Sequence, residues 1–346
     1  MPTKPCLPIA FLTFLLSFTL PLYGDDLLQT ANNVLLYQRN TGGWPKNYDR
    51  SAKLSETERT QLILDKTKTD STIDNGATHR EIRILATAYK RSGNPTFHDA
   101  AVAGVKYLLK AQYSNGGWPQ RYPLPTSYHR HITYNDDAMI GVMNLFRDIV
   151  QGSGDLDLVS GDLRKQCDLA LQRGLQCILK TQIRVDGKLT AWCAQHDAKT
   201  LAPAKARSYE LPSLSGNESV GIVRYLMKIE NPDNDVTAAV EGAIAWFKSA
   251  QLKGIRQITI EAPGAPNGKD IKVIRDPSAP PLWGRFYNIK TQQPFFCSRD
   301  GIPKSTIAEI SHERRNGYSW LGGYAAELLQ KHYPQWKKDH SSTIPQ

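Results

Sequence analysis

Two short acidic clusters contain the residue types best suited to chemistry in this sequence. They are Asp74 with Asn75, and Asp136 with Asp137. Each cluster comes directly before a predicted helix, where Asp and Asn commonly cap the helix N-terminus. If both helices begin at the same mouth of a larger assembly, the carboxylates and the amide oxygen converge. Such oxygens are the ligands that Ca²⁺ prefers, and a pair of carboxylates would equally serve a glycoside hydrolase as acid and base.

Arginines in unusual surroundings form the second candidate group. Four of them stand in segments rich in Trp, Tyr, Gly and Pro: Arg207, Arg285, Arg299 and Arg314. A guanidinium matches a carboxylate bidentately, which is how a site would hold uronic acids. A single arginine is usually solvated, so the setting of the four favours a site. Three tryptophans would stack on sugar rings or, more commonly, pack in the core: Trp44, Trp118 and Trp283.

The elements that position these residues follow a repeat. Four apolar helical stretches end in glutamines spaced 74, 70 and 69 residues apart: Gln38, Gln112, Gln182 and Gln251. The first two are followed by near-identical Gly-Gly-Trp-Pro loops, and the third by a degenerate version that ends at Trp192. Recurrence at a nearly fixed period indicates a repeated supersecondary unit.

Each repeat is predicted to hold two helices, from the helical spacing of apolar residues and the Gly, Asn and Pro breaks between them. The predicted pairs are 77–90 with 97–112, 138–150 with 163–182, and 219–229 with 236–251. Alternation in 256–261 and 270–275 predicts a β-hairpin, and 276–305 is predicted to be irregular and functional. The expected fold is all-α dominated, an α/α toroid of three helical hairpins with a small β-hairpin and long irregular active-site loops.

The N-terminus and the charge bear on location and partners. Residues 1–24 have a basic start at Lys4, a short apolar run and a cleavage point at Gly24, as a secretory signal does. We therefore expect a single catalytic domain over 25–340 and a tail over 341–346. Removing 1–24 takes one lysine and no acid from a net charge of +10, which leaves +9. This charge attracts polyanions, and outside the cell acidic polysaccharide is a more natural partner than nucleic acid.

Eight segments, in order over nearly the whole mature chain, resemble the pectate lyases of polysaccharide lyase family 10. They are 40–49, 71–78, 132–139, 192–197, 206–219, 281–287, 295–301 and 313–323. The resemblance implies an α/α toroid of three hairpins, in agreement with the repeat. It also implies cleavage of polygalacturonate by β-elimination, with Ca²⁺ as cofactor and an arginine as base.

The resemblance also implies roles for single residues. Arg299, in the word Phe-Cys-Ser-Arg-Asp-Gly, would be the base. Asp74 and Asp136 would hold calcium and the reacting carboxylate with help from Asn75, while Asp137 is a calcium ligand or only a cap. Five residues would bind substrate in the cleft: Arg207, Arg285, Arg314, Lys46 and Tyr318.

Elimination sets an electrostatic requirement. The base removes the C5 proton beside a carboxylate that is already negative, so calcium and arginines must neutralise that carboxylate. A free arginine has a pKa near 13.8. We expect neighbouring cations to lower the pKa of Arg299, and activity to be highest at alkaline pH.

Three alternatives remain open at this point. The first is an α/α-toroid glycoside hydrolase with Asp74 and Asp136 or Asp137 as acid and base. The second is a terpene-cyclase-like barrel, because of the Gln and Trp repeats. The third is a non-catalytic polysaccharide-binding module. Under the lyase hypothesis the protein is a secreted or periplasmic monomer that acts on polygalacturonate, with no nucleic acid partner and no membrane contact once the signal is removed.

Overall fold

The computed structural model describes residues 23–340, and its framework is three pairs of helices. The pairs are α3 (His79–Ser92) with α4 (Pro95–Ala111), α5 (Ala138–Gln151) with α6 (Gly161–Thr181), and α7 (Glu218–Leu226) with α8 (Asn234–Ser249). Each pair packs together, as the sequence repeat predicts. The observed ends differ from the predicted ones by three residues at most. The helical hairpin prediction is therefore confirmed.

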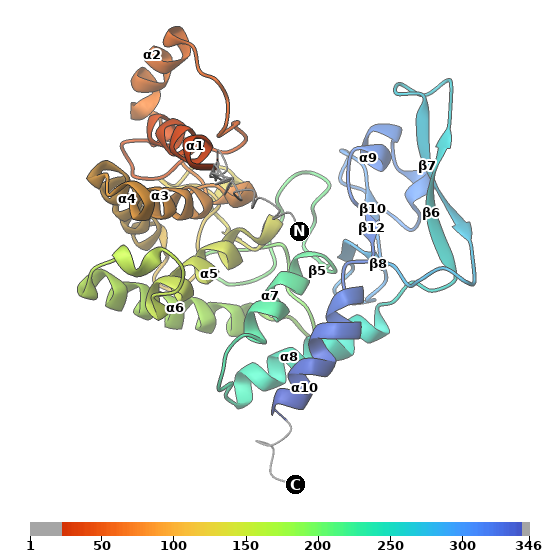
Figure 1. Ribbon diagram of the computed structural model, residues 1–346. Helices are drawn as coiled ribbons and strands as arrows, with labels where there is room; N and C mark the ends of the chain where they lie inside the picture. Colours follow the sequence, from red (N-terminus) through yellow and green to blue (C-terminus); the bar gives the residue numbers. More distant parts are fainter. Residues whose placement is uncertain (1–22, 341–346) are drawn as a thin grey trace, which may run out of the picture.

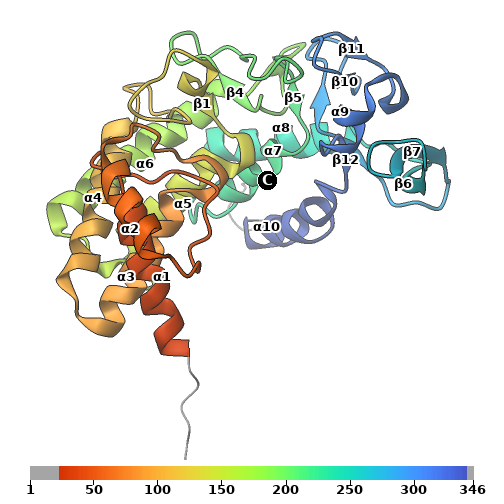
Figure 2. The same ribbon diagram turned by 90° about the horizontal axis from the view of Figure 1, so that it is seen from above.

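The pairs form two rows of helices (Figures 1 and 2). In the first row α1 (Tyr23–Tyr37) contacts α3, α3 contacts α5 and α5 contacts α7. In the second row α4 contacts α6 and α6 contacts α8. Within residues 23–340, three α-helices lie outside the two rows: α2 (Glu56–Leu64), α9 (His312–Asn316) and α10 (Tyr333–His340), the last preceded by a π-helical turn at Leu328–His332. Closure of the rows into a complete toroid stays a prediction.

The repeated glutamines join one unit to the next. The side-chain amide of Gln38 donates to the carbonyls of Gly42 and Ala100, both at 2.9 Å. Gln112 makes the same pair of bonds to Gly116 and Ala170, and Gln182 makes it to Thr190 and Ala239. Each amide therefore uses both hydrogens, one for the following loop and one for the next helix of the second row (α4, α6 or α8).

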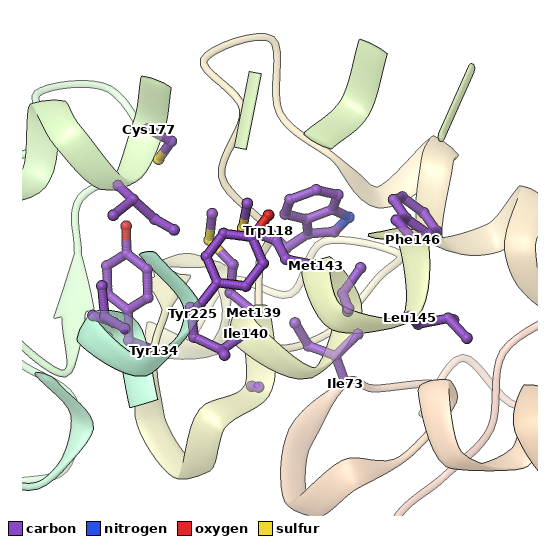
Figure 3. Close-up of a cluster of buried hydrophobic side chains, with 14 of the residues drawn as sticks. Ile73, Trp118, Tyr134, Met139, Ile140, Met143, Leu145, Phe146, Cys177 and Tyr225 are labelled. Atoms are coloured by element: carbon purple, nitrogen blue, oxygen red, sulfur yellow. The ribbon is translucent and has the colours of Figure 1, made fainter. Parts of the chain in front are cut away.

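The tryptophans of the repeated loops belong to the core. Each indole N–H donates to a backbone carbonyl near the end of the helix that precedes its loop: Trp44 to Val34 of α1, Trp118 to Leu108 of α4, Trp192 to Ile178 of α6 and Trp283 to Phe247 of α8. All four rings are at most 1% exposed. Stacking of Trp44, Trp118 or Trp283 on sugar rings is thus excluded in this structure, because the rings are covered by protein. Figure 3 shows Trp118 among buried side chains of α5, including Met143 and Phe146.

The strands are short, with one exception. The β-hairpin of β6 (Ile255–Glu261) and β7 (Lys269–Arg275) is antiparallel, with Ile255 opposite Arg275, and matches the sequence prediction. It lies at the edge of the molecule, away from the helical rows (Figure 1). The other strands have two residues each: β1 (Ile132–Thr133), β2 (Arg184–Val185), β3 (Lys188–Leu189), β4 (Gln195–His196), β5 (Leu214–Ser215), β8 (Trp283–Gly284), β9 (Phe286–Tyr287), β10 (Phe296–Cys297), β11 (Pro303–Lys304) and β12 (Leu321–Gly322).

The late, irregular part of the chain has a hydrophobic cluster of its own. This second core includes Tyr209, Phe286, Phe296, Ile310 and Trp320, all buried, and is distinct from the main core of the helical pairs. Pairing of β5 with β9 and of β8 with β12 ties it to the rest of the chain. The irregular segment is therefore packed in place.

Two sequence predictions fall at the ends of the chain. The secretory signal over 1–24 lies almost wholly outside the described residues, as does the tail over 341–346, and both stay predictions. Within residues 23–340, no helix has the length and apolar character needed to cross a membrane.

The glutamine links can be tested at Gln182, the most buried of the three. Gln182→Leu leaves the carbonyls of Thr190 and Ala239 without their donor, which should lower the free energy of unfolding by about 2–4 kcal/mol. The matched control is Gln172→Leu on the exposed face of α6, where the amide bonds only to Asp168; its effect should stay within about 0.5 kcal/mol. Urea denaturation measures both, and equal effects would contradict the structural role of Gln182.

Candidate active site

A polar pocket of about 270 Å³ lies where the turns before α3 and α5 meet. Five of the residues predicted from sequence line it: Lys46, Asp74, Asn75, Asp136 and Arg207. Six further residues complete the lining: Asn47, Gln120, Tyr128, Asn135, Gln195 and Glu210. The predicted convergence of the two acidic clusters is thus present, since both reach one pocket.

The two acidic turns have the same backbone shape. Each is a single 3₁₀ turn, and Asn75 and Asp136 take left-handed conformations at φ 51° and 50°. Asn and Asp tolerate this region better than most residues, and such conformations concentrate at functional sites. In this geometry Asp136 is the counterpart of Asn75, and Asn135 is the counterpart of Asp74. The carboxylates that face the pocket are therefore offset by one residue between the two repeats.

Helix capping does not explain the acidic clusters. Helix α3 has Thr78 and helix α5 has Asp137 at the N-cap position, and neither side chain makes a capping hydrogen bond. Asp74 accepts a hydrogen bond from the Asn75 N–H, within the 3₁₀ turn, at 3.0 Å. Asp74, Asn75 and Asp136 thus line the pocket and do not cap the helix ends.

Both pocket carboxylates have cationic neighbours. Asp74 is buried and forms an ion pair with Lys46. Asp136 accepts from the Asn135 amide at 2.6 Å and lies 3.4 Å from the Arg285 guanidinium. Burial raises the pKa of Asp136, and Arg285 opposes this effect. The pocket therefore combines negative oxygens with fixed positive charge at its wall.

Arg285 belongs to a buried charge network. Its guanidinium, 8% exposed, forms an ion pair with the fully buried carboxylate of Glu218 in the first turn of α7, and also contacts Asn135 at 3.3 Å. Burial would lower the pKa of Arg285, but the interactions with Glu218, Tyr318 and Asp136 together outweigh burial and raise it. The network joins the second repeat, the third repeat and the late segment beside the pocket.

The four predicted arginines lie against two tyrosine rings. The guanidinium carbons of Arg207, Arg299 and Arg314 lie 5.2, 5.7 and 4.6 Å from the centre of the Tyr209 ring. Arg285 lies 4.7 Å from the centre of the Tyr318 ring. Such cation–π contacts hold guanidinium groups without neutralising them. All four predicted arginines are thus brought to one region.

Glu210 links this region to the pocket. It is buried and accepts two side-chain hydrogen bonds from Arg207, at 2.5 and 2.8 Å, and one from the Tyr318 hydroxyl at 2.7 Å. Burial would lower the pKa of Arg207, but these bonds outweigh it and raise the pKa. Tyr318 therefore reaches the site through Glu210 and Arg207.

Arg299 differs from Arg207 in position and partner. It does not line the pocket, and its side chain is 64% exposed in an ion pair with Glu313 at 2.9 Å. Arg314 shares the same Glu313. The expected lowering of the pKa of Arg299 is wrong for this arrangement, because the hydrogen bonds to Glu313 raise it.

Asp137 faces a different pocket, between α5 and α7. It takes φ 56° directly after the left-handed Asp136, so the two neighbouring side chains diverge. Among residues 23–340, no group of three or more His, Cys, Asp or Glu side chains has the geometry to hold a metal ion. A cation in the polar pocket would rely on Asp74 and Asp136, neutral oxygens and groups from outside the chain.

Sequence reasoning missed several functional side chains. Tyr209 and Glu210 stand two and three residues from Arg207, and this short spacing was the available signal. Glu218 resembles an ordinary acidic residue in a helix first turn, and nothing in its spacing pointed to Arg285. Gln120 lines the pocket, and its buried Oε1 has no hydrogen-bond partner in the described structure.

A protein-family model for pectic acid lyases matches residues 38–329, which is most of the chain and includes every pocket residue. The chain belongs to the pectic acid lyase family. The predicted enzyme class, a polysaccharide lyase, is therefore confirmed. No curated protein sequence matches the chain.

Two similar solved structures agree with this family. One is an aspartate-to-alanine mutant of the family 10 polysaccharide lyase from Cellvibrio cellulosa in complex with trigalacturonic acid. It is 36% identical, covers 87% of this chain and 90% of its own, and has a TM-score of 0.76. The other is the family 10 polysaccharide lyase from the same organism, 35% identical over 90% of this chain and 96% of its own, with a TM-score of 0.74.

The network of Arg285 allows a test that separates stability from binding in this pectic acid lyase. Arg285→Met leaves Glu218 buried without its counter-ion and should lower the free energy of unfolding by about 3–5 kcal/mol. Adding Glu218→Gln removes the stranded charge and should restore most of the stability but not the activity. Thermal unfolding and lyase assays of both variants check this. A double variant as unstable as the single one would contradict the proposed pairing.

Proposed function

We propose that the enzyme cleaves polygalacturonate by β-elimination, with calcium bound at Asp74 and Asp136 and an arginine as base. The observation that carries the proposal is the polar pocket, which brings these two carboxylates together with Arg207. The three other arginines around Tyr209 and Tyr318 surround it with positive charge. Family membership and the trigalacturonic acid bound to the similar lyase support the substrate class.

The pocket residues fit a hard cation. Asp74, Asp136, Asn75 and the unpaired Oε1 of Gln120 offer oxygen atoms only, as Ca²⁺ prefers. Glu210, the third carboxylate of the pocket, is already bonded to Arg207 and Tyr318. The two others are few for a dedicated calcium site, so carboxylates of the substrate and water would complete the ligand set. When bound, the cation would neutralise the uronate carboxylate and stabilise the charge that develops beside it.

The chain itself supplies binding and proton transfer. Arg285 and Arg314 would hold substrate carboxylates, because a guanidinium matches a carboxylate bidentately. Lys46 would bind a substrate carboxylate as a point charge. An arginine would remove the C5 proton, the bond from C4 to the glycosidic oxygen would break, and its electrons would leave with that oxygen. The electron pair of the broken C5–H bond forms the C4–C5 double bond, and no water attacks.

The identity of the base is the finer point. The family resemblance assigns this role to Arg299, whereas Arg207 lines the pocket beside the two carboxylates. Both guanidinium groups lie against the same Tyr209 ring. The position in the pocket favours Arg207 as the base, and Arg299 would then hold a substrate carboxylate after leaving Glu313. A free guanidinium at pH 10 is neutral only about once in 10⁴, so forming the neutral base costs about 5 kcal/mol of free energy. Either arginine as base therefore predicts an alkaline optimum.

Location and assembly complete the proposal. A secretory signal over 1–24 would deliver the enzyme to the periplasm or the exterior, where pectate is found. We propose that it acts there as a monomer.

Elimination can be distinguished from hydrolysis by the product. With polygalacturonate and Ca²⁺, absorbance in the near ultraviolet should rise as the unsaturated uronide forms, and a chelator should abolish the rise. Asp136→Ala should require a higher calcium concentration for half-maximal rate. Reducing ends that appear without new absorbance would instead support the hydrolase with Asp74 and Asp136 as acid and base.

The two arginines are separated by paired variants. Arg207→Ala should reduce kcat by at least about 10³-fold with little change in oligogalacturonate affinity, because loss of a general base affects the chemical step. Arg299→Ala should mainly raise KM. The reverse result would return the role of base to Arg299.

The dependence of the rate on pH tests Arg207 as the base, because a merely structural role of Arg207 would not change it. Since Glu210 raises the pKa of Arg207, Glu210→Gln should shift the rising limb of the rate profile to lower pH. An unchanged limb would contradict Arg207 as the base.

A further inference from the structure

A second polar pocket, of about 320 Å³, lies between α5 and α7. The residues that matter for its chemistry are Asp137, Asn144, Asn217, Arg224 and Lys228, with Tyr225 and Tyr324 at its wall. Its volume falls in the usual range for small-ligand sites, about 300–1,000 Å³. Except for Asp137, none of these residues belongs to the site described above.

The second pocket is a neighbour of the catalytic one. Consecutive residues Asp136 and Asp137 line one pocket each, because both have left-handed backbones and their side chains diverge. Asn217 precedes Glu218, which binds Arg285, which in turn contacts Asp136. The Asp136–Arg285–Glu218 network thus stands between the two pockets.

Helix α7 is shaped to admit the Asp137 side chain. A Cβ atom at Gly221 would lie 1.9 Å from Asp137 Oδ1, so only glycine leaves room for this carboxylate. The carboxylate therefore lies directly against the α7 backbone.

Asn217 donates to Glu218 and the Tyr324 hydroxyl donates to Ser319, but other polar groups of this pocket are not satisfied by the described part of the protein. Arg224 on α7 and Lys228, two residues beyond the end of α7 at Leu226, are both exposed. Neither side chain has a hydrogen bond or an ion pair to another residue in the described part of the chain. Asn144 Oδ1 is buried and likewise has no hydrogen-bond partner there. Two cations against one carboxylate leave a net charge of about +1.

This combination matches one kind of ligand. Arg224 and Lys228 offer charged donors to a carboxylate, while Asn144 Oδ1 and Asp137 offer acceptors to hydroxyl groups. A sugar acid has a carboxylate and several hydroxyls on one ring. A neutral sugar would leave the cations unused, and a nucleotide phosphate would lie close to Asp137.

We propose that the pocket between α5 and α7 is an additional subsite for a uronate of the same acidic polysaccharide. It would hold a sugar of a long chain whose scissile bond lies in the catalytic pocket. The inference rests on the proposed function for the identity of the polymer. Its consequence is that long chains bind better than short ones through Arg224 and Lys228.

The test compares Arg224→Gln/Lys228→Gln with the wild type on oligogalacturonates of increasing length and on polygalacturonate. Loss of two charged donors should raise KM for the polymer about tenfold, with kcat unchanged and a much smaller effect on the trimer. Asn144→Ala should change KM in the same direction. The control is Lys106→Gln/Lys110→Gln, which removes two exposed charges at the same spacing on α4.

The outcomes are separable. An equal loss at every chain length, or an equal loss in the α4 control, would overturn the subsite, since general attraction alone would explain it. Methyl-esterified polymer should show no difference between variant and wild type in affinity electrophoresis with chelator present. If the wild type forms no unsaturated product, the proposed function fails. The same electrophoresis on unesterified polymer still decides the subsite, because retardation must fall in the Arg224→Gln/Lys228→Gln variant.

Discussion

The double hydrogen bond of a buried glutamine amide is the constraint on which the architecture depends. A primary amide has two donor hydrogens at a fixed angle, so closing a loop and fixing the next helix occur together. At Gln112 the two carbonyls belong to Gly116 and to Ala170 of α6. An apolar side chain of the same size would leave both carbonyls without a donor. Each loop is therefore fixed to the next helix of the second row. This arrangement brings the acidic turns before α3 and α5 to one pocket.

The positive charges of the arginines in the site are balanced by carboxylates of the protein itself. Burying an arginine is costly unless a carboxylate accompanies it. Glu218 accompanies Arg285 and Glu210 accompanies Arg207, and both carboxylates are buried. The more exposed Arg299 and the buried Arg314 share Glu313 at the surface. A uronate that enters the cleft would meet guanidinium groups that are already oriented, and it would compete with Glu313 more easily than with Glu218.

Helices and the hairpin could be predicted because each depends on local sequence. At the Asn94-Pro95 break, for example, Asn94 is the N-cap of α4 and Pro95 its first residue, two residues before the predicted start at 97. The pocket was only partly predictable. The sequences around Asp74 and Asp136 look equivalent. In the structure, however, left-handed residues shift the position of the pocket carboxylate by one residue between the two turns. The periodicity of a sequence gives no information on φ. Glu218 and Gln120 become functional through contacts with Arg285 and the pocket that no spacing along the chain reveals. The tryptophan rings were ambiguous until burial decided for the core.

The site is assembled from two cores with separate tasks. The carboxylates follow residues of the main core, since Asp74 comes after Ile73 and Asp136 lies two residues beyond Tyr134. The arginines accompany the second core, since Arg207 stands near Tyr209 and Arg285 precedes Phe286. The oxygens that we propose as metal ligands therefore come from the helical repeats, and the four arginines come from the irregular segments. The late part of the chain lacks regular structure and is still packed on Trp320, which suits the proposed task of placing guanidinium groups along a flexible polymer.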